Sequence, residues 1–278
     1  MSSPAPRNTK LLWLALPGVG VLAAFFLMPL ATVFVEATKT NAFVRLFAAS
    51  EFWDALVASL WLGARAAALS LVVGIGVAAH LARLSPRLRS ALQVLIALPL
   101  TFSGLIVAYG FILLLGRAGF VTLLLEKLGG DPAVIAGAFY GPVGLVLAYS
   151  YYLIPRVVLM LLPVFLNFDS RQMQAAESLG APRWRAWLEI VLPQVAPTFL
   201  AAFCLVAAVA VGAYGTALAL VGTQLNILPL RLYSLIADAG ADFPLASAVS
   251  VLLLAVCSMI MAVAEIAAAR SEDDDVRA

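Results

Sequence analysis

The chain has 278 residues, of which 64% are hydrophobic and only 12% are charged, and its mean hydropathy is +1.04. A water-soluble domain carries about a quarter charged residues, so this composition excludes a soluble fold. The formal net charge of +2 does not indicate a nucleic-acid-binding surface, and two cysteines with a single histidine offer no metal-ligand spacing.

Six largely uncharged segments are long enough to cross a membrane, because a spanning helix needs about 20 mostly apolar residues. The first segment is longer than the apolar core of a signal peptide, so we expect it to be retained as a helix. Turn residues at Pro193, Pro197 and Gly222 divide the longest uncharged stretch. We therefore predict an all-α integral membrane protein with helices over about 11–35, 55–82, 91–116, 138–163, 197–221 and 245–268.

Lysine and arginine are distributed unevenly between the two ends of these helices. With the N-terminus inside, ten of them fall in the predicted cytoplasmic segments and five on the opposite face. Because short cytoplasmic loops are rich in Lys and Arg, both termini are expected in the cytoplasm. The predicted organisation is a tail over 1–10, a six-helix domain over 11–268 and an acidic tail over 269–278, with both tails unstructured.

The longest polar segment, about 164–196, lies between the fourth and fifth predicted helices. Asp169 or Ser170 is placed to cap a helix, and Gly180 suits a left-handed turn at the end of that helix. Pro182 suits the start of a second helix, which Pro193 is expected to end. The segment is therefore predicted to form a rigid helix–turn–helix.

The sequence of this segment resembles the coupling loop of a known family. Residues 174–180 read Gln-Ala-Ala-Glu-Ser-Leu-Gly, and Ile-Val-Leu-Pro follows at 190–193. This pattern resembles the Glu-Ala-Ala loop of the permease subunits of binding-protein-dependent ABC importers, with Gln174 in place of the leading Glu. Weaker resemblance extends over 59–83 and over the Leu-Pro turn at 97–100. The resemblance implies the type I importer fold, with a cytoplasmic coupling helix between helices 4 and 5.

The resemblance also implies a function and partners. Such permeases work in pairs, as homodimers or heterodimers, and carry solute across the bacterial inner membrane by alternating access. Two ATPase subunits bind the pair inside, and a solute-binding protein binds it outside. The chain has no GxxxxGK[ST] loop, so ATP and Mg would be held by the ATPase subunits, and this chain would be neither an enzyme nor a cofactor carrier. The residues expected to couple to the ATPase are Gln174, Ala175, Ala176, Glu177, Gly180, Ala181, Ile190, Leu192 and Pro193.

Within this family the segments 211–216, 221–223 and 227–230 are most similar to permeases for polyamines, opines or phosphonates, with ferric ion or thiamine as alternatives. A solute path is lined by polar or aromatic side chains that face the bundle interior. Tyrosine rings suit a cationic amine, and their hydroxyls suit a phosphonate, while Arg65 could contact an anionic solute. The alternatives are that these hydroxyls bond to nearby backbone and that Arg65 pairs with an acid on a neighbouring helix or extends outward to water. The candidates are Arg65, Ser103, Tyr109, Tyr149, Tyr152, Tyr214 and Thr216.

Two other classes of membrane protein compete with this interpretation. A secondary transporter driven by an ion gradient needs acidic residues inside its helices, and the predicted helices contain only Glu265, near a helix end. A membrane enzyme needs clustered His, Asp or Glu, and His80 is the single histidine. Both are weaker than the permease interpretation.

Overall fold

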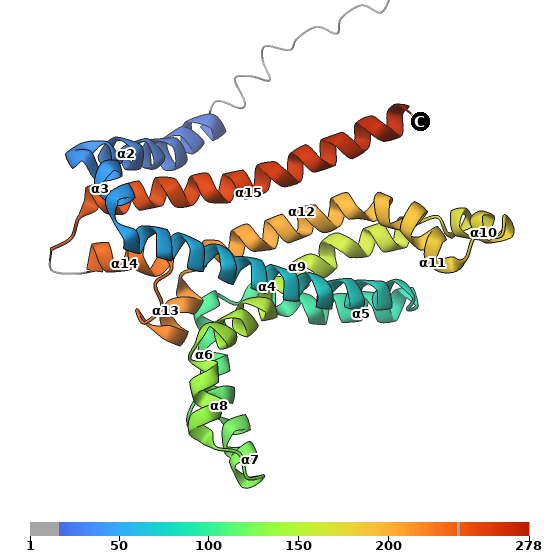
Figure 1. Cartoon of the computed structure of the whole chain (residues 1–278), viewed down its shortest axis with the longest axis horizontal. Coiled ribbons are helices and arrows are strands. Elements are labelled where there is room, and N and C mark those ends of the chain that lie inside the picture. The colour runs from blue at the N-terminus through green and yellow to red at the C-terminus, as the bar shows by residue number, and fades with distance from the viewer. Residues whose placement is uncertain (1–16, 238–239, 278) are drawn as a thin grey trace, which may run out of the picture.

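The computed structural model describes residues 17–237 and 240–277, and every regular element in these ranges is helical. Figure 1 shows a bundle of long helices from which one lobe projects sideways. Six helices are long and apolar enough to cross a membrane, as the sequence predicts. They are Pro17–Ala37, Ser50–Ala82, Gly104–Lys127, Pro142–Asn167, Arg183–Val211 and Phe243–Ile266.

Three helices form the core of the bundle: α4 (Ser50–Ala82), α9 (Pro142–Asn167) and α12 (Leu192–Val211). They approach closely because α4 presents glycine at both contacts. A Cβ on Gly74 would lie 2.5 Å from Val157 Cγ1 of α9, and one on Gly63 would lie 2.6 Å from Val211 Cγ2 of α12. Small residues at such contacts drive the association of helices in membranes, where van der Waals packing replaces the hydrophobic effect.

A second apolar cluster closes one end of the bundle, where α3 (Ala42–Ala48) and α14 (Leu228–Ala237) meet α4. There α15 (Phe243–Arg277) packs against both α2 (Met28–Ala37) and α3. Arg45 of α3 donates a hydrogen bond to the carboxylate of Asp242, just before α15, and this bond holds the pKa of Asp242 below its ordinary value.

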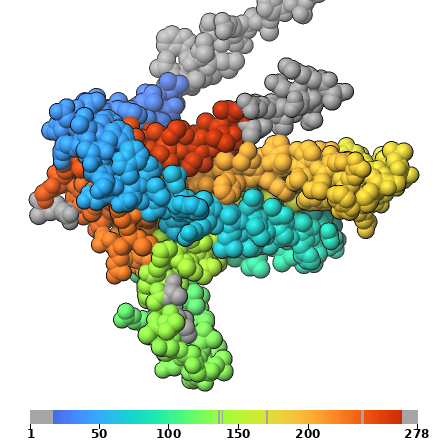
Figure 2. All heavy atoms as spheres, in the orientation of Figure 1, coloured from blue at the N-terminus to red at the C-terminus, as the bar shows by residue number. Residues whose placement is uncertain are grey.

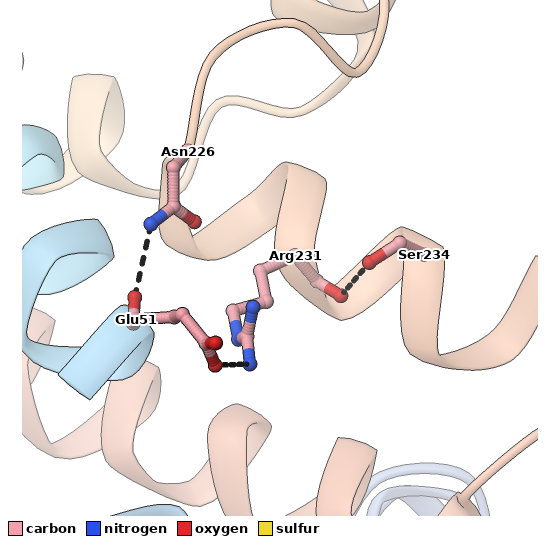
Figure 3. A network of polar contacts seen from close by, with 4 residues as sticks. All are labelled: Glu51, Asn226, Arg231 and Ser234. Carbon is pink, nitrogen blue, oxygen red and sulfur yellow. Dashed lines mark hydrogen bonds and ion pairs between the residues drawn. The ribbon is translucent and has the colours of Figure 1, made fainter. Parts of the chain in front are cut away.

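Polar contacts bind α14 to the first turn of α4, as Figure 3 shows. Arg231 Nη2 donates to Glu51 Oε2 at 3.1 Å, and Asn226 Nδ2 donates to the backbone carbonyl of Glu51 at 3.0 Å. The buried Leu228 N–H donates to Ser59 Oγ at 2.8 Å. The chain that follows the fifth membrane helix is therefore fixed to the N-terminal half of α4.

The predicted third helix over 91–116 is not one helix. The chain forms α5 (Pro86–Ala97) and one 3₁₀ turn, η3 (Leu98–Thr101); it is then extended through Phe102 and Ser103 before α6 (Gly104–Leu115) begins. Pro99 lies in the 3₁₀ turn, where the resemblance placed a Leu-Pro turn, and Ser103 caps α6 by accepting from the Ile106 N–H. In Figure 1, α6 leaves the bundle at a steep angle and forms the lobe with α7 (Phe120–Lys127) and α8 (Pro132–Phe139).

The fifth predicted helix, 197–221, also has different ends. Helix α11 (Arg183–Ala186) continues through a π-helical turn, η4 (Trp187–Val191), directly into α12, so Pro193 does not end it. Pro193 directly follows this π-helical turn, where the regular i→i−4 hydrogen bonding of the helix is already interrupted. The helix stops at Val211, and 215–221 form a separate short helix, α13 (Gly215–Val221).

The predicted tails have different outcomes. Residues 1–10 lie outside the described chain. The acidic tail is helical and not unstructured, because α15 runs without a break to Arg277. Its alanine, glutamate and arginine residues favour helix, and extending an existing helix avoids the cost of nucleation. The remaining short elements are η1 (Ala23–Leu27), η2 (Lys39–Asn41) and α10 (Ser170–Ser178).

The glycine contact between α4 and α9 predicts a selective effect of one methyl group. Gly74→Ala should lower the free energy of unfolding by about 1–3 kcal/mol, because overpacking forces Val157 to move. Gly76→Ala is the matched control, since a Cβ there meets nothing within 4 Å. Thermal midpoints of both variants in detergent measure the difference. Equal midpoints would show that α4 and α9 do not rely on this contact.

Candidate functional site

The predicted helix–turn–helix forms the far end of the bundle. Figure 1 shows α10 and α11 beyond the ends of α5 and α9, and Figure 2 shows them as a protruding knob in yellow. Asp169 caps α10 as predicted, because its carboxylate accepts from the Arg171 N–H at 2.9 Å. We call residues 169–191 the coupling hairpin.

Gly180 makes the turn of the coupling hairpin possible. Its φ is +90°, the left-handed region predicted for this position and one that residues with a Cβ rarely adopt. The Gly180 N–H donates to the Glu177 carbonyl at 3.0 Å, and the Ala181 N–H reaches back to the Ala176 carbonyl at 3.0 Å. These bonds satisfy the last carbonyls of α10. Arg183 also donates to the Glu177 carboxylate at 2.9 Å, across the turn.

The predicted coupling residues fall into two groups. Those at the tip are exposed or half-buried, whereas Ile190, Leu192 and Pro193 lie where the coupling hairpin joins α12. One strongly exposed tip residue was missed from the sequence: Leu179 is 89% exposed, and its apolar side chain after a polar helix was the available signal. The tip residues are Gln174, Ala175, Ala176, Glu177, Gly180 and Ala181.

Two contacts make the coupling hairpin rigid with respect to the membrane helices. Gln194 Nε2 of α12 donates to Gln172 Oε1 of α10 at 2.7 Å. The second helix of the hairpin has no break before α12, and Ala186 and Val191 are buried. The second helix of the coupling hairpin and α12 therefore form one continuous helix.

At the other end of α12, the interrupted helices enclose a cavity of about 410 Å³. It lies between η3, the start of α6, the middle of α9 and the loop that joins α12 to α13. Four of the predicted solute-path residues line it together: Ser103, Tyr152, Tyr214 and Thr216. We call this the inner cavity.

Arg156 of α9 also lines the inner cavity, although the sequence analysis did not select it. Its Nη1 donates to the Tyr152 carbonyl at 3.1 Å, and its guanidinium lies 5.9 Å from the centre of the Tyr152 ring. The available signal was its position in the middle of a long apolar segment, where arginine is costly.

The other three predicted residues lie elsewhere. The Tyr149 side chain is fully buried, and its hydroxyl donates to the Ala213 carbonyl at 2.8 Å. Tyr109 is 55% exposed on α6. Arg65 lies on α4 with its guanidinium 5.5 Å from the centre of the Trp61 ring, and no ion pair of the described chain includes it. The expected pairing of Arg65 with an acid is therefore absent there.

A larger cavity of about 810 Å³ lies between the C-terminal ends of α6 and α13. Leu113, Arg117 and Gln224 are among its lining residues, and Arg117 is the one charged residue on its wall in the described chain. In that same part of the chain no three His, Cys, Asp or Glu side chains come together as a metal site.

Comparison with known proteins gives one family. Residues 70–272 match the binding-protein-dependent transport system inner membrane component. The chain is 31% identical over 209 residues to sulfate permease 2, chloroplastic, of Chlamydomonas reinhardtii, covering 73% of this chain and 55% of that one. It is 27% identical to the molybdenum transport system permease protein ModB of Mycobacterium bovis, covering 90% and 91%. It is also 27% identical to the spermidine/putrescine transport system permease protein PotB of Haemophilus influenzae, covering 80% and 75%.

The fold is that of a solved transporter. A chain in the crystal structure of a bacterial ABC transporter involved in the import of the acidic polysaccharide alginate superposes with a TM-score of 0.72. The two chains are 20% identical, and the match covers 95% of this chain and 96% of that one.

The buried hydroxyl of Tyr149 can be tested for a structural role, as opposed to a role in lining the solute path. Tyr149→Phe should lower the free energy of unfolding by about 0.5–1.5 kcal/mol and speed amide exchange over 212–216, because the Ala213 carbonyl loses its donor. Tyr109→Phe is the matched control, since Tyr109 is exposed. Unchanged exchange over 212–216 in Tyr149→Phe would contradict the structural role.

Proposed function

The chain belongs to the family of binding-protein-dependent transport system inner membrane components and is a type I ABC importer permease. We propose that it carries solute by alternating access and that its coupling hairpin controls this change. A partner ATPase would press on the tip of the coupling hairpin. The inner cavity would then change its access from one side of the membrane to the other. This is a two-state element that a nucleotide-driven partner biases.

The shape of the coupling hairpin is the observation that carries this proposal. A compact tip extends beyond the membrane helices, with Leu179 exposed for insertion into a partner and small alanines that allow a close approach. The tip contacts are Gln174, Ala175, Ala176, Glu177, Gly180 and Ala181, whereas Ile190, Leu192 and Pro193 would transmit the movement. Gln174 replaces a charged glutamate of the family pattern with an amide, which still donates and accepts hydrogen bonds.

The expected assembly follows from the family. An ABC importer permease acts with an ATPase and a solute-binding partner in the inner membrane. We infer two ATPase subunits that hold ATP and Mg, a second permease subunit and an extracytoplasmic solute-binding protein. Both termini would be cytoplasmic, because the C-terminal end of α15 and the coupling hairpin lie toward the same end of the bundle in Figure 1.

Coupling to an ion gradient is disfavoured by the composition of the core helices. Within the described chain, α6, α9, α12 and α13 contain no acidic residue, so no carboxylate of these helices could carry a proton. We therefore infer that the energy for transport comes from the partner ATPase.

We propose that the solute is a small molecule or ion. The relatives are named for sulfate, molybdenum and spermidine/putrescine, so their names include both anions and cations. The expected polyamine, opine and phosphonate solutes differ in charge in the same way. The charge lining the inner cavity is the property of this chain that can distinguish them.

The left-handed turn at Gly180 tests the coupling role. Gly180→Val should abolish solute-dependent uptake, because a Cβ at φ +90° costs about 1–2 kcal/mol and distorts the tip. Uptake into cells and ATPase stimulation by the solute-binding protein are the measurements, with membrane insertion checked by quantitative blotting.

Gly129→Val is the matched control. Gly129 has φ +91°, and a Cβ added there, as at Gly180, would have no neighbour within 4 Å, but Gly129 follows α7 in the lobe. This variant carries similar local strain and should retain uptake. Full uptake by Gly180→Val would show that the coupling hairpin does not transmit the stroke.

A further inference from the structure

Arg156 lies well inside α9, the fourth membrane helix. With a rise of about 1.5 Å per residue, it is about 21 Å from the first residue of α9 and about 17 Å from the last. The helix is longer than the hydrocarbon core, which is about 30 Å thick, so the Cα of Arg156 lies within the core when α9 spans it. A charged side chain at this depth has to face water, a partner charge or a ligand.

No acid of the described chain neutralises Arg156. It takes part in none of the ion pairs formed there, and the helices that bound the inner cavity contain no Asp or Glu. Its two contacts, the Tyr152 carbonyl and the Tyr152 ring, leave most of its five N–H donors free. The guanidinium is therefore held in place but not compensated.

The inner cavity adds neutral hydrogen-bonding groups around this cation. Ser103, the N-cap residue of α6, brings an exposed hydroxyl to its wall, whereas the Thr216 side chain at its edge is almost fully buried. Gly104 allows α6 and α13 to meet, since a Cβ on it would lie 2.4 Å from Thr216 Oγ1. The volume of about 410 Å³ holds a small ligand with its water.

We propose that the inner cavity is a binding site for a small oxyanion, of the phosphate, sulfate, molybdate or phosphonate type, with Arg156 as its charged ligand. The proposal rests on the proposed transport function and specifies the solute charge. A guanidinium binds such oxygens through two parallel N–H···O bonds, and the hydroxyl of Ser103 supplies a further donor. A polyamine is itself a cation, so in the inner cavity it would be repelled by the Arg156 guanidinium. No carboxylate of the described chain lies there to bind it.

Direct binding tests the site without relying on ATP hydrolysis. The full-length chain, with the subunits that co-purify, is placed in phosphatidylcholine nanodiscs. Binding of radiolabelled sulfate, phosphate, molybdate and putrescine is then measured at equilibrium. We expect saturable binding of at least one oxyanion and none of putrescine. Binding of putrescine alone, or of no probe, would overturn the proposal.

Variants of Arg156 assign the binding to the inner cavity. Arg156→Gln should weaken oxyanion binding at least about tenfold, whereas Arg156→Lys, which keeps the charge but loses the bidentate fork, should weaken it less. Ser103→Ala gives a second, smaller loss if Arg156→Gln does not fold, as judged by its thermal midpoint and gel filtration. Arg87→Gln removes the same charge from α5, outside the inner cavity, and should bind as the parent does. Equal affinity in the parent and in folded Arg156→Gln would contradict the assignment.

Two further measurements distinguish a solute from a lipid headgroup as the occupant, and the binding proposal from the coupling proposal. If phosphatidylglycerol added to the nanodiscs displaces the oxyanion, a lipid headgroup is the occupant and the solute assignment is wrong. Gly180→Val should lose uptake and keep oxyanion binding. Retained uptake in that variant would refute the coupling role while leaving the binding site intact, so the two proposals fail separately.

Discussion

The close approach of α4 to both α9 and α12 is the constraint on which the rest of this structure depends. Gly74 admits Val157 of α9, and Gly63 admits Val211 of α12, so both neighbours pack directly on the backbone of α4. The same contact orients α9 so that Ser150 faces the Ala66 carbonyl of α4, while Arg156 lines the inner cavity. In a membrane such packing replaces the hydrophobic effect as the force that holds helices together.

Helix α12 joins the two functional regions. With α11 and η4 it forms 29 continuous helical residues, about 43 Å long, from the coupling hairpin to the loop at the inner cavity. The opposite side of the bundle is fixed, because Glu51 and Ser59 of α4 hold the segment that follows α13. Under the proposed coupling, a displacement at the tip would move one wall of the inner cavity relative to this fixed segment.

The breaks in the membrane helices occur where the inner cavity lies, and the backbone there has partners. Irregular backbone at membrane depth is tolerated only when it is buried in protein or lines a water-filled space. Tyr149 supplies a donor to the Ala213 carbonyl, and Ser103 accepts from the first turn of α6. These hydrogen bonds offset the free-energy cost of interrupting the helices. The interruption leaves a polar cavity within the bundle, where continuous helices would place apolar side chains.

The sequence by itself determined the membrane class, the helical content and the coupling hairpin. Length and apolar composition decide whether a segment spans a bilayer, and the cap at Asp169 and the turn at Gly180 depend on residues within one turn of each other. Only the tertiary structure decided where the third and fifth helices break, that Tyr149 is a buried donor, and that Arg156 shares a cavity with Ser103 and Thr216. The physical reason is that these features arise from contacts between helices far apart in the chain, and hydropathy within one segment carries no information about which neighbour a side chain meets.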